Sequence, residues 1–291
     1  MSIRDLGYRP YDGERHPAEQ NTWVILRHSL GRAWRSWIIK LTLLFSWIPV
    51  MGFILVSRAA SLFNNDPTAA FDPNPWHDWL LHAQWLSAAF VIALASGAGA
   101  IAYDLNHNAF AYFFSKPVTA VQYLVGRMGA VVVLCLLVTL LPAGLFAAAM
   151  VALDSGTIED NAISLARATA GALVISIMMG VCSVGFSALN RSRAFTFSAW
   201  VLLFFVPWGL ASLVQAVSDW PWLRLAAFPM LVSDLVDAIC DQTTEEEVVR
   251  WYHVAPVAIA LTRQMLWRFT AEPTPHRTLG IDGPMALHLG A

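Results

Sequence analysis

The sequence predicts an all-α membrane protein with several transmembrane helices. Hydrophobic residues make up 57% of its 291 residues and charged residues only 13%, whereas about a quarter of an ordinary soluble domain is charged. Several stretches of about 20 apolar residues are nearly free of charge, and a helix of that length crosses a hydrocarbon core of roughly 30 Å. The stretches are continuous rather than alternating, so they predict helices and not the strands of a β-barrel.

Five spans are expected from these stretches, at 38–56, 83–103, 128–153, 168–189 and 194–217. A sixth, at 248–267, is interrupted by Arg250, His253 and Arg263. A helix that ends near Arg268 places Arg263 about 7 Å from the interface, within reach of the headgroups. Aromatic residues at its two ends fit the interfacial belts in which such side chains are enriched: Trp251, Tyr252 and Trp267. We therefore predict six spans.

The positive charges predict the orientation. With the N-terminus inside, 14 of the 18 Lys and Arg residues fall on the cytoplasmic side, and the outer side keeps Arg58, Arg167, Arg224 and Arg250. This positive-inside bias predicts that both termini lie in the cytoplasm. The membrane we expect is the bacterial inner membrane. The predicted units are a cytoplasmic tail with an interfacial helix at 1–37, a six-span domain at 38–268 and a second cytoplasmic tail at 269–291.

An amphipathic helix is expected before the first span. Apolar residues recur there at helical spacing on one side, and polar residues occupy the other. Such a helix lies on the membrane surface, where its arginines meet acidic lipid. The residues assigned to this surface are Trp23, Arg27, Arg32, Trp34 and Arg35. Two interpretations stay open: the segment is only a topology signal, or its polar face also touches a cytosolic subunit.

Several site classes are disfavoured by the sequence. A net charge of −2 and dispersed Lys and Arg residues give no nucleic-acid surface, and the three cysteines have no metal-ligand or redox spacing. His77, Asp78 and His82 match no recognised metal-ligand set and are expected in a solvated loop.

The segment 222–240 is interrupted by polar residues and predicts short helices that dip in from outside, with Asp234 and Asp237 at the interface. Small residues in spans two and four, among them Gly97 and Ser183, are expected to pack helices.

The connection between spans two and three, 103–127, carries the most specific pattern. Asp104 or Asn106 can cap a first short helix, Pro117 ends it, and Thr119 can cap a second helix. The connection is unusually apolar for a segment outside the membrane, because it contains Phe110, Phe113, Phe114 and Tyr123. An exposed aromatic patch of this kind predicts contact with a partner or with the membrane.

The same connection resembles the loop between spans two and three in the permeases of ABC transporters of the type-two export class. The family pattern is an acidic start followed by L-S-[KR]-P-V-[ST], a variable pair and Y-[LV]-x-G-[KR]. This chain matches it at Asp104, Ser115, Lys116, Pro117, Val118, Thr119, Tyr123, Leu124, Gly126 and Arg127. It departs from the family at 106–108, where neutral residues stand in place of common charges.

The resemblance implies the permease subunit of an ABC-type exporter, with this loop as a short coupling helix on a separate cytosolic ATPase. It assigns the ATPase contact to Asp104, Phe110, Phe113, Phe114, Ser115, Lys116, Pro117, Tyr123 and Arg127. ATP and Mg would be bound by that partner, and a second permease copy, identical or related, would complete the path. The chain contains no G-x-x-x-x-G-K-[ST] phosphate loop, so we expect it to be no enzyme and to hold no cofactor.

Two other functions stay open at this level. An ABC-like complex can transmit ATP-driven motion to a periplasmic or surface partner without transporting anything, and the outer segment 218–247 would serve either purpose. An intramembrane enzyme would need Ser, His and Asp side chains together within the spans. The spans contain serines, but no suitable His or Asp lies near them except His253 at a margin.

Overall fold

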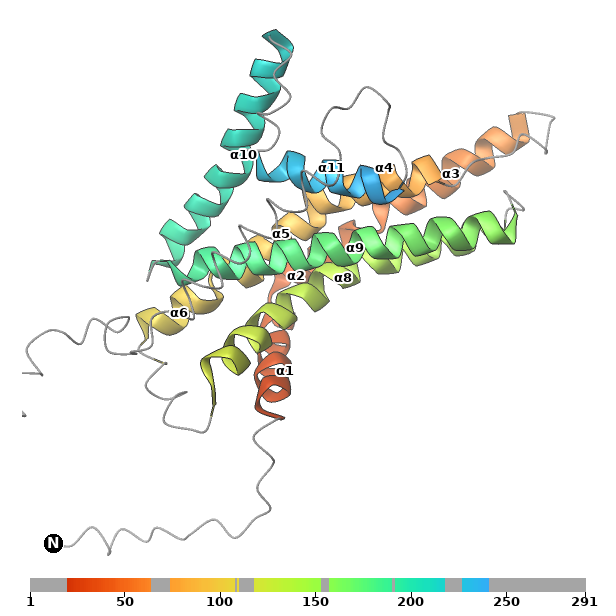
Figure 1. Ribbon diagram of the computed structural model, residues 1–291. Helices are drawn as coiled ribbons and strands as arrows, with labels where there is room; N and C mark the ends of the chain where they lie inside the picture. Colours follow the sequence, from red (N-terminus) through yellow and green to blue (C-terminus); the bar gives the residue numbers. More distant parts are fainter. Residues whose placement is uncertain are drawn as a thin grey trace, which may run out of the picture.

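The computed structural model describes residues 20–63, 74–107, 109, 118–152, 157–189, 192–217 and 227–240, and all regular structure within these ranges is helical (Figure 1). The elements are α1 (Asn21–Trp34), α2 (Trp37–Phe45), α3 (Ile48–Phe63), α4 (Asn74–Gln84), the π-helix η3 (Trp85–Ala89), α5 (Phe90–Ile92), the π-helix η4 (Ala93–Gly97), α6 (Ala100–Asn106), α8 (Ala120–Ala152), α9 (Ile158–Ala188), α10 (Arg193–Val217) and α11 (Phe228–Cys240).

Five helical stretches in this part of the chain are long and apolar enough to cross a membrane. They are Trp37–Leu55, Asp78–Asn106, Ala120–Ala152, Ile158–Ala188 and Arg193–Val214, so each of the five clear spans is confirmed as an apolar helix of crossing length. The predicted sixth span, at 248–267, lies outside the described residues.

The third and fourth spans are longer than predicted, because their polar ends remain helical. Side-chain caps explain where these helices begin. Before α8, the Thr119 hydroxyl accepts from the Gln122 amide (3.2 Å) and the Gln122 side chain accepts from the Thr119 amide (3.1 Å), which confirms Thr119 as the cap. Before α9, the Thr157 hydroxyl accepts from the Asp160 amide (3.1 Å). Such caps satisfy amide groups that the first helical turn leaves without partners.

The first two spans are irregular. The first is broken between α2 and α3, where Pro49 has no N–H to donate to the carbonyl of Phe45. The second contains the two π-helices η3 and η4. Where η4 gives way to α6, the Ser187 hydroxyl of α9 accepts from the amides of Ile101 and Ala102, both at 2.9 Å. A side chain of the neighbouring span thus satisfies backbone groups at the irregular point.

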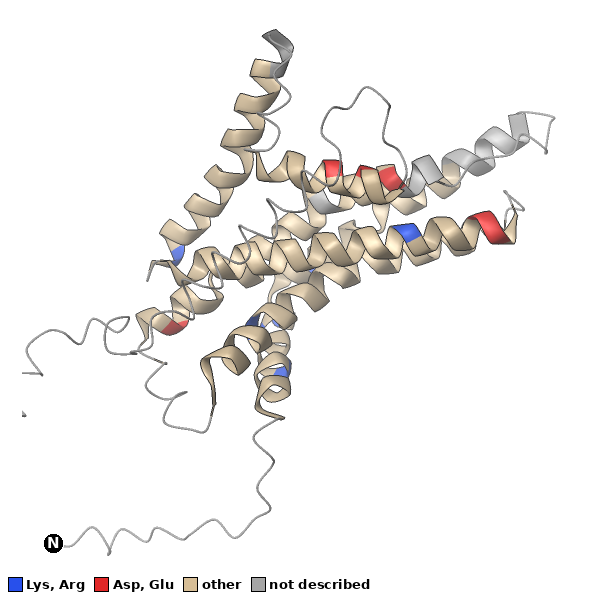
Figure 2. Ribbon diagram, in the orientation of Figure 1, with Lys and Arg blue, Asp and Glu red and all other residues tan. Residues whose placement is uncertain are grey.

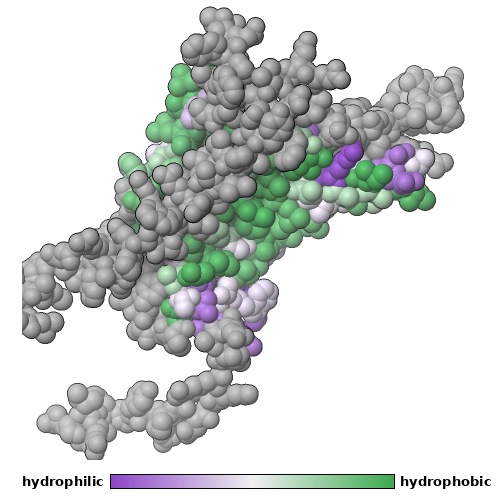
Figure 3. All heavy atoms as spheres, in the orientation of Figure 1, coloured by the Kyte–Doolittle hydropathy of each residue, from purple (hydrophilic) through white to green (hydrophobic). Residues whose placement is uncertain are grey.

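The core lies between α8, α9 and the second span (Figure 1). Gly97 of η4 lies directly against Ser183 of α9, and Gly180 against Val132 of α8, so the packing role predicted for the small residues is confirmed at these contacts. A second layer is aromatic: Phe90, Trp200, Phe204 and Phe228 pack around one another. The described surface is hydrophobic along the middle of the bundle and hydrophilic near its two ends (Figure 3).

Candidate functional site

A buried polar cluster lies where α6 ends and α8 begins. Its centre is Asp104, whose Oδ2 accepts a hydrogen bond from the Tyr123 hydroxyl (2.6 Å) and another from Nη2 of Arg127. Arg127 also donates through Nη1 to the Ser29 hydroxyl of α1 (3.2 Å), and Nη1 of Arg32 lies 3.9 Å from Asp104 Oδ1. The Asp104 cluster therefore joins α1, α6 and α8 at one end of the bundle.

Local structure brings these groups together. Tyr123 and Arg127 are four residues apart on α8, so they share one face of the helix, and the cap at Thr119 fixes where that face begins. Asp104 stands in the last turn of α6, where a negative charge is disfavoured by the helix dipole. The two arginines offset this cost because they approach the same carboxylate.

The three central side chains are almost fully buried. The exposed fraction is 0% for Tyr123, 2% for Asp104 and 3% for Arg127. A buried carboxylate is tolerated when it is paired with a cation and hydrogen-bonded, and removal of one partner leaves an uncompensated charge. The cluster therefore fixes the two ends of the 103–127 connection to each other.

Close packing of α1 on α8 adds a third element to this end. A Cβ atom on Gly126 would lie 2.8 Å from Cγ2 of Ile25, and one on Gly129 would lie 2.8 Å from Cδ1 of Leu26. Both glycines therefore let the two helices approach more closely than a side chain would allow. Gly126 is the point at which α1 packs most closely on the start of α8.

The nine residues assigned to the ATPase contact divide into two groups. Asp104, Tyr123 and Arg127 come together in the Asp104 cluster and are almost fully buried. In this arrangement they hold the ends of the loop to each other. The other six lie outside the described residues: Phe110, Phe113, Phe114, Ser115, Lys116 and Pro117.

The residues assigned to the membrane surface all lie on α1 or directly after it. Trp23, Trp34 and the three arginines at 27, 32 and 35 are exposed, as expected. The predicted apolar face is divided, however, because Leu26 and Leu30 face the rest of the bundle. The helix thus packs against α8 with one edge and leaves its tryptophans outside. Figure 2 shows several basic residues at this end of the molecule.

A second polar cluster links α4 to α11, far from the first. Nε2 of His82 lies 2.7 Å from the Ser233 hydroxyl and 3.3 Å from Asp237 Oδ1, while its Nδ1 lies 3.0 Å from the Asp78 carbonyl and 3.4 Å from Asp78 Oδ1. The expectation that Asp78 and His82 stand in a solvated loop is wrong, because both belong to helix α4 and are partly buried.

The acidic residues of α11 point into the bundle. Asp237 approaches His82, and Asp234 is buried at 5% exposure. Ligand atoms of Asp78, His82 and Asp237 lie within 4.8 Å of one another and could hold a cation. Their two carboxylates approach opposite nitrogens of the imidazole ring, however, an arrangement that suits a hydrogen-bonded histidine. The sequence signal that was missed is the i, i+4 spacing of Asp78 and His82.

The three cysteines are buried and unpaired with one another, as packing residues are. Comparison with known proteins adds nothing to the site: no family model matches the chain, and no curated protein matches it.

Proposed function

We propose that this chain is the membrane-spanning permease subunit of an ABC-type exporter in the bacterial inner membrane. A separate cytosolic ATPase binds ATP and Mg, and the permease couples hydrolysis to the movement of a substrate. Both termini are placed in the cytoplasm, on the side of α1 and of the 103–127 connection. The chain itself carries out no reaction.

The observation that carries this proposal is the Asp104 cluster. The motif that resembles the exporter permeases was read from sequence alone, yet five of its positions have a structural task at one place. Asp104, Tyr123 and Arg127 tie the ends of the loop together, Thr119 caps the helix that follows, and Gly126 seats α1. A loop that receives force from a partner needs ends that are firmly attached to the spans, and this connection has them.

The cluster also indicates how motion would be transmitted. A displacement of the 110–117 segment pulls on α6 and α8 together, because the buried ion pair joins them. Through Ser29 and Arg32, the same displacement reaches α1. A small shift at the partner surface is then converted into a movement of whole helices, which is the way packed helices rearrange between two states.

Two spans leave room for lipid and for a second permease copy. Only 22% of the Trp37–Leu55 window and 17% of the Arg193–Val214 window are buried inside the chain, against 53% to 61% for the other three. α10 in particular leans away from the bundle (Figure 1) and exposes Phe195, Leu202, Leu210 and Leu213. Faces of this kind pack against a neighbouring helix or against lipid chains.

The test is affinity purification of the tagged chain from its native membrane in mild detergent, followed by mass spectrometry. We expect an ATPase with a phosphate-binding loop to co-purify in stoichiometric amount. The double variant Phe113→Ala/Phe114→Ala should lose that ATPase, because it removes the aromatic groups assigned to the contact. The matched control is Leu44→Ala/Phe45→Ala, which removes two exposed apolar side chains of α2 and should retain the ATPase.

Both variants must insert into the membrane at the level of the unaltered chain. Repeated purification of the unaltered chain without any ATPase would contradict the proposal. ATPase binding retained by the Phe113/Phe114 variant would contradict the assignment of the contact while leaving the exporter complex in place.

A further inference from the structure

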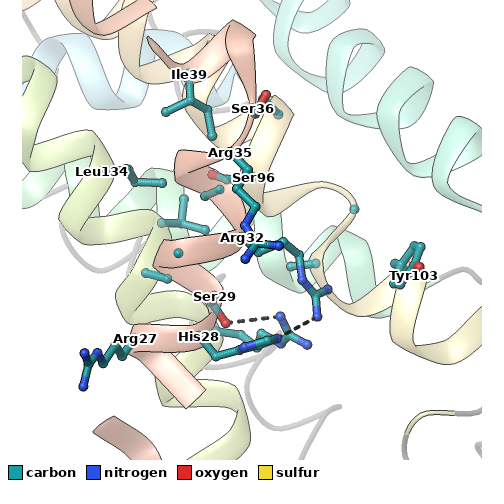
Figure 4. Close-up of a pocket in the computed structure, with 18 of the residues that line it drawn as sticks. Arg27, His28, Ser29, Arg32, Arg35, Ser36, Ile39, Ser96, Tyr103 and Leu134 are labelled. Carbon is teal, nitrogen blue, oxygen red and sulfur yellow. Dashed lines mark hydrogen bonds between the residues drawn. The ribbon is translucent and has the colours of Figure 1, made fainter. Parts of the chain in front are cut away.

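A cavity of about 950 Å³ lies beside the Asp104 cluster, between α1 and α2 on one side and the second span and α8 on the other. Figure 4 shows Arg32 and Arg35 projecting from the α1 side, and the guanidinium carbon of Arg32 lies 5.7 Å from the centre of the Tyr103 ring. Arg193, at the start of α10, approaches Gly99 on another wall, where a Cβ atom would lie 3.0 Å from its Nε. Residues of α1, α2, η4, α6, α8 and α10 therefore line one cavity.

The cavity is basic at one end. Its polar lining includes Arg27, His28, Arg32, Arg35, Arg127 and Arg193, and no Asp or Glu stands among the described residues that line it. Asp104 lies beside the cavity, where it pairs with Arg127 and lies 3.9 Å from Arg32. Five arginines thus line the cavity, and the Asp104 carboxylate approaches two of them, Arg32 and Arg127. An excess of positive charge around a cavity of this size favours an anionic ligand.

The other end of the cavity is apolar. It is lined by Ile39, Ala95, Ala100, Ala130, Val131 and Leu134, and it follows α8 inward from Arg127 to Leu134. Seven residues of helix correspond to about 10 Å at 1.5 Å per residue. The lining therefore changes from cationic to apolar along α8, from Arg127 near its start to Leu134 further inside the span.

The size of the lining side chains explains why space remains. Gly99, Ala95, Ser96 and Ala100 present little bulk from the second span, and the Ser96 hydroxyl donates to the Ile92 carbonyl of its own helix (2.6 Å) rather than into the cavity. In the core, small residues of this kind are filled by a neighbouring helix, as Gly97 is by Ser183. Here α1 lines the cavity with its arginines and does not fill it.

We propose that this cavity binds an acidic phospholipid, with the phosphate among the arginines and the upper part of an acyl chain against the apolar lining. The polarity gradient matches an amphiphile that carries a negative head and a hydrocarbon tail, and a free anion would leave the apolar end unused. Guanidinium groups suit phosphate oxygens, since they offer paired donors in a fixed plane. The bound lipid would join α1 to the second span without any contact between their backbones.

This inference goes beyond the proposed exporter function and does not depend on an ATPase. Because the ligand would belong to the membrane itself, the site would be occupied whenever acidic lipid is present. Its occupancy would brace α1 against the second span at the Asp104 cluster.

The experiment is native mass spectrometry of the purified full-length chain in a neutral detergent. Phosphatidylglycerol, phosphatidylcholine with the same acyl chains, and inorganic phosphate are each titrated, alone and in competition. We expect retained phosphatidylglycerol at concentrations at least about tenfold below those needed for phosphatidylcholine, because each basic side chain near an anionic lipid contributes a factor of about five. Inorganic phosphate should not displace the lipid.

Three variants test the location. Arg35→Gln and Arg193→Gln should each weaken phosphatidylglycerol binding about fivefold, and Ser96→Leu should weaken both lipids by filling the apolar end. Lys40→Gln is the matched control, since Lys40 is an exposed cation on α2 that does not line the cavity. Its binding should equal that of the unaltered chain.

The outcomes that would overturn the proposal are distinct. Equal losses for Arg35→Gln and Lys40→Gln would mean that the lipid is held by general surface charge. Displacement by inorganic phosphate would mean a simple anion site, and unaltered binding by Ser96→Leu would remove the acyl chain from the cavity. Arg35 is exposed, so Arg35→Gln is expected to fold and keeps the test decisive if Ser96→Leu does not.

Discussion

At the scale of single residues, the Asp104 cluster places three residues of the 103–127 connection inside the bundle. A surface motif would be expected to place its charged and aromatic groups outward. Here Asp104, Tyr123 and Arg127 point inward and satisfy one another. Low exposure makes these interactions stronger than at a surface, and it makes each one costly to break.

The ion pair predicts strong coupling between its two partners. Arg127→Met and Asp104→Leu should each destabilise the chain by about 3 to 5 kcal/mol, because each leaves a buried charge without its partner. The double variant removes both charges and should lose about 1 to 3 kcal/mol less than the two single losses combined. Thermal unfolding in detergent measures all three.

The matched control is Lys40→Met, which removes an exposed cation on α2 that does not line the cavity and should change stability by less than about 0.5 kcal/mol. Additive losses in the double variant would show that Asp104 and Arg127 do not depend on each other.

At the scale of helices, the arrangement depends on how closely neighbours approach. α8 contains glycines in two different surroundings: Gly126 lies against Ile25 and the Thr22 carbonyl of α1, whereas nothing approaches the Cβ position of Gly144 within 4 Å. The same substitution on one helix therefore has opposite consequences, which a propensity scale cannot distinguish.

Gly126→Ala should push α1 away from α8 and cost about 1 to 3 kcal/mol, as overpacking of a fitted contact does. Gly144→Ala, on the same helix, should be neutral or slightly stabilising. Limited trypsin digestion measures the separation directly, because Arg27 and Arg32 become more accessible to the protease when α1 moves away from α8. Equal digestion of the two variants would contradict the close packing of α1 against Gly126.

At the scale of the whole molecule, the alternation of the spans sets which ends lie on the same side. α9 connects Thr157 to Ser192, and both of these residues are exposed just outside helix ends. The basic α1 end and the Asp104 cluster lie near Ser192, since Arg193 lines the cavity beside them. The positive-inside rule then predicts Ser192 in the cytoplasm and Thr157 outside.

Single cysteines introduced as Thr157→Cys and Ser192→Cys test this orientation with a membrane-impermeant maleimide. The three native cysteines are buried, so the background should be low. In intact spheroplasts the Thr157 position should be labelled, and the Ser192 position only after permeabilisation. Labelling of both from the same side would mean that α9 does not cross, and a reversed pattern would place α1 outside.

Much of the fold could be predicted because hydropathy and charge act along the chain. Neighbouring residues predict the positions of five spans, the amphipathic segment before them and the cap at Thr119. Continuous apolar helices are stable in lipid because they satisfy their own backbone groups. The break before Pro49 does not follow from hydropathy, because the apolar stretch is continuous through it. The π-helices of the second span left no local signal, because they depend on contacts with α8 and α9.

The sequence by itself determined that the chain is helical, apolar enough for a membrane, basic toward one side, and marked by one unusual loop. Only the tertiary structure decided that Asp104 and Arg127 form a buried pair, that His82 faces Asp237, and that five arginines surround one cavity. The physical reason is that burial and pairing depend on which helices become neighbours. Residues 23 and 155 positions apart acquire their roles only when packing brings them together.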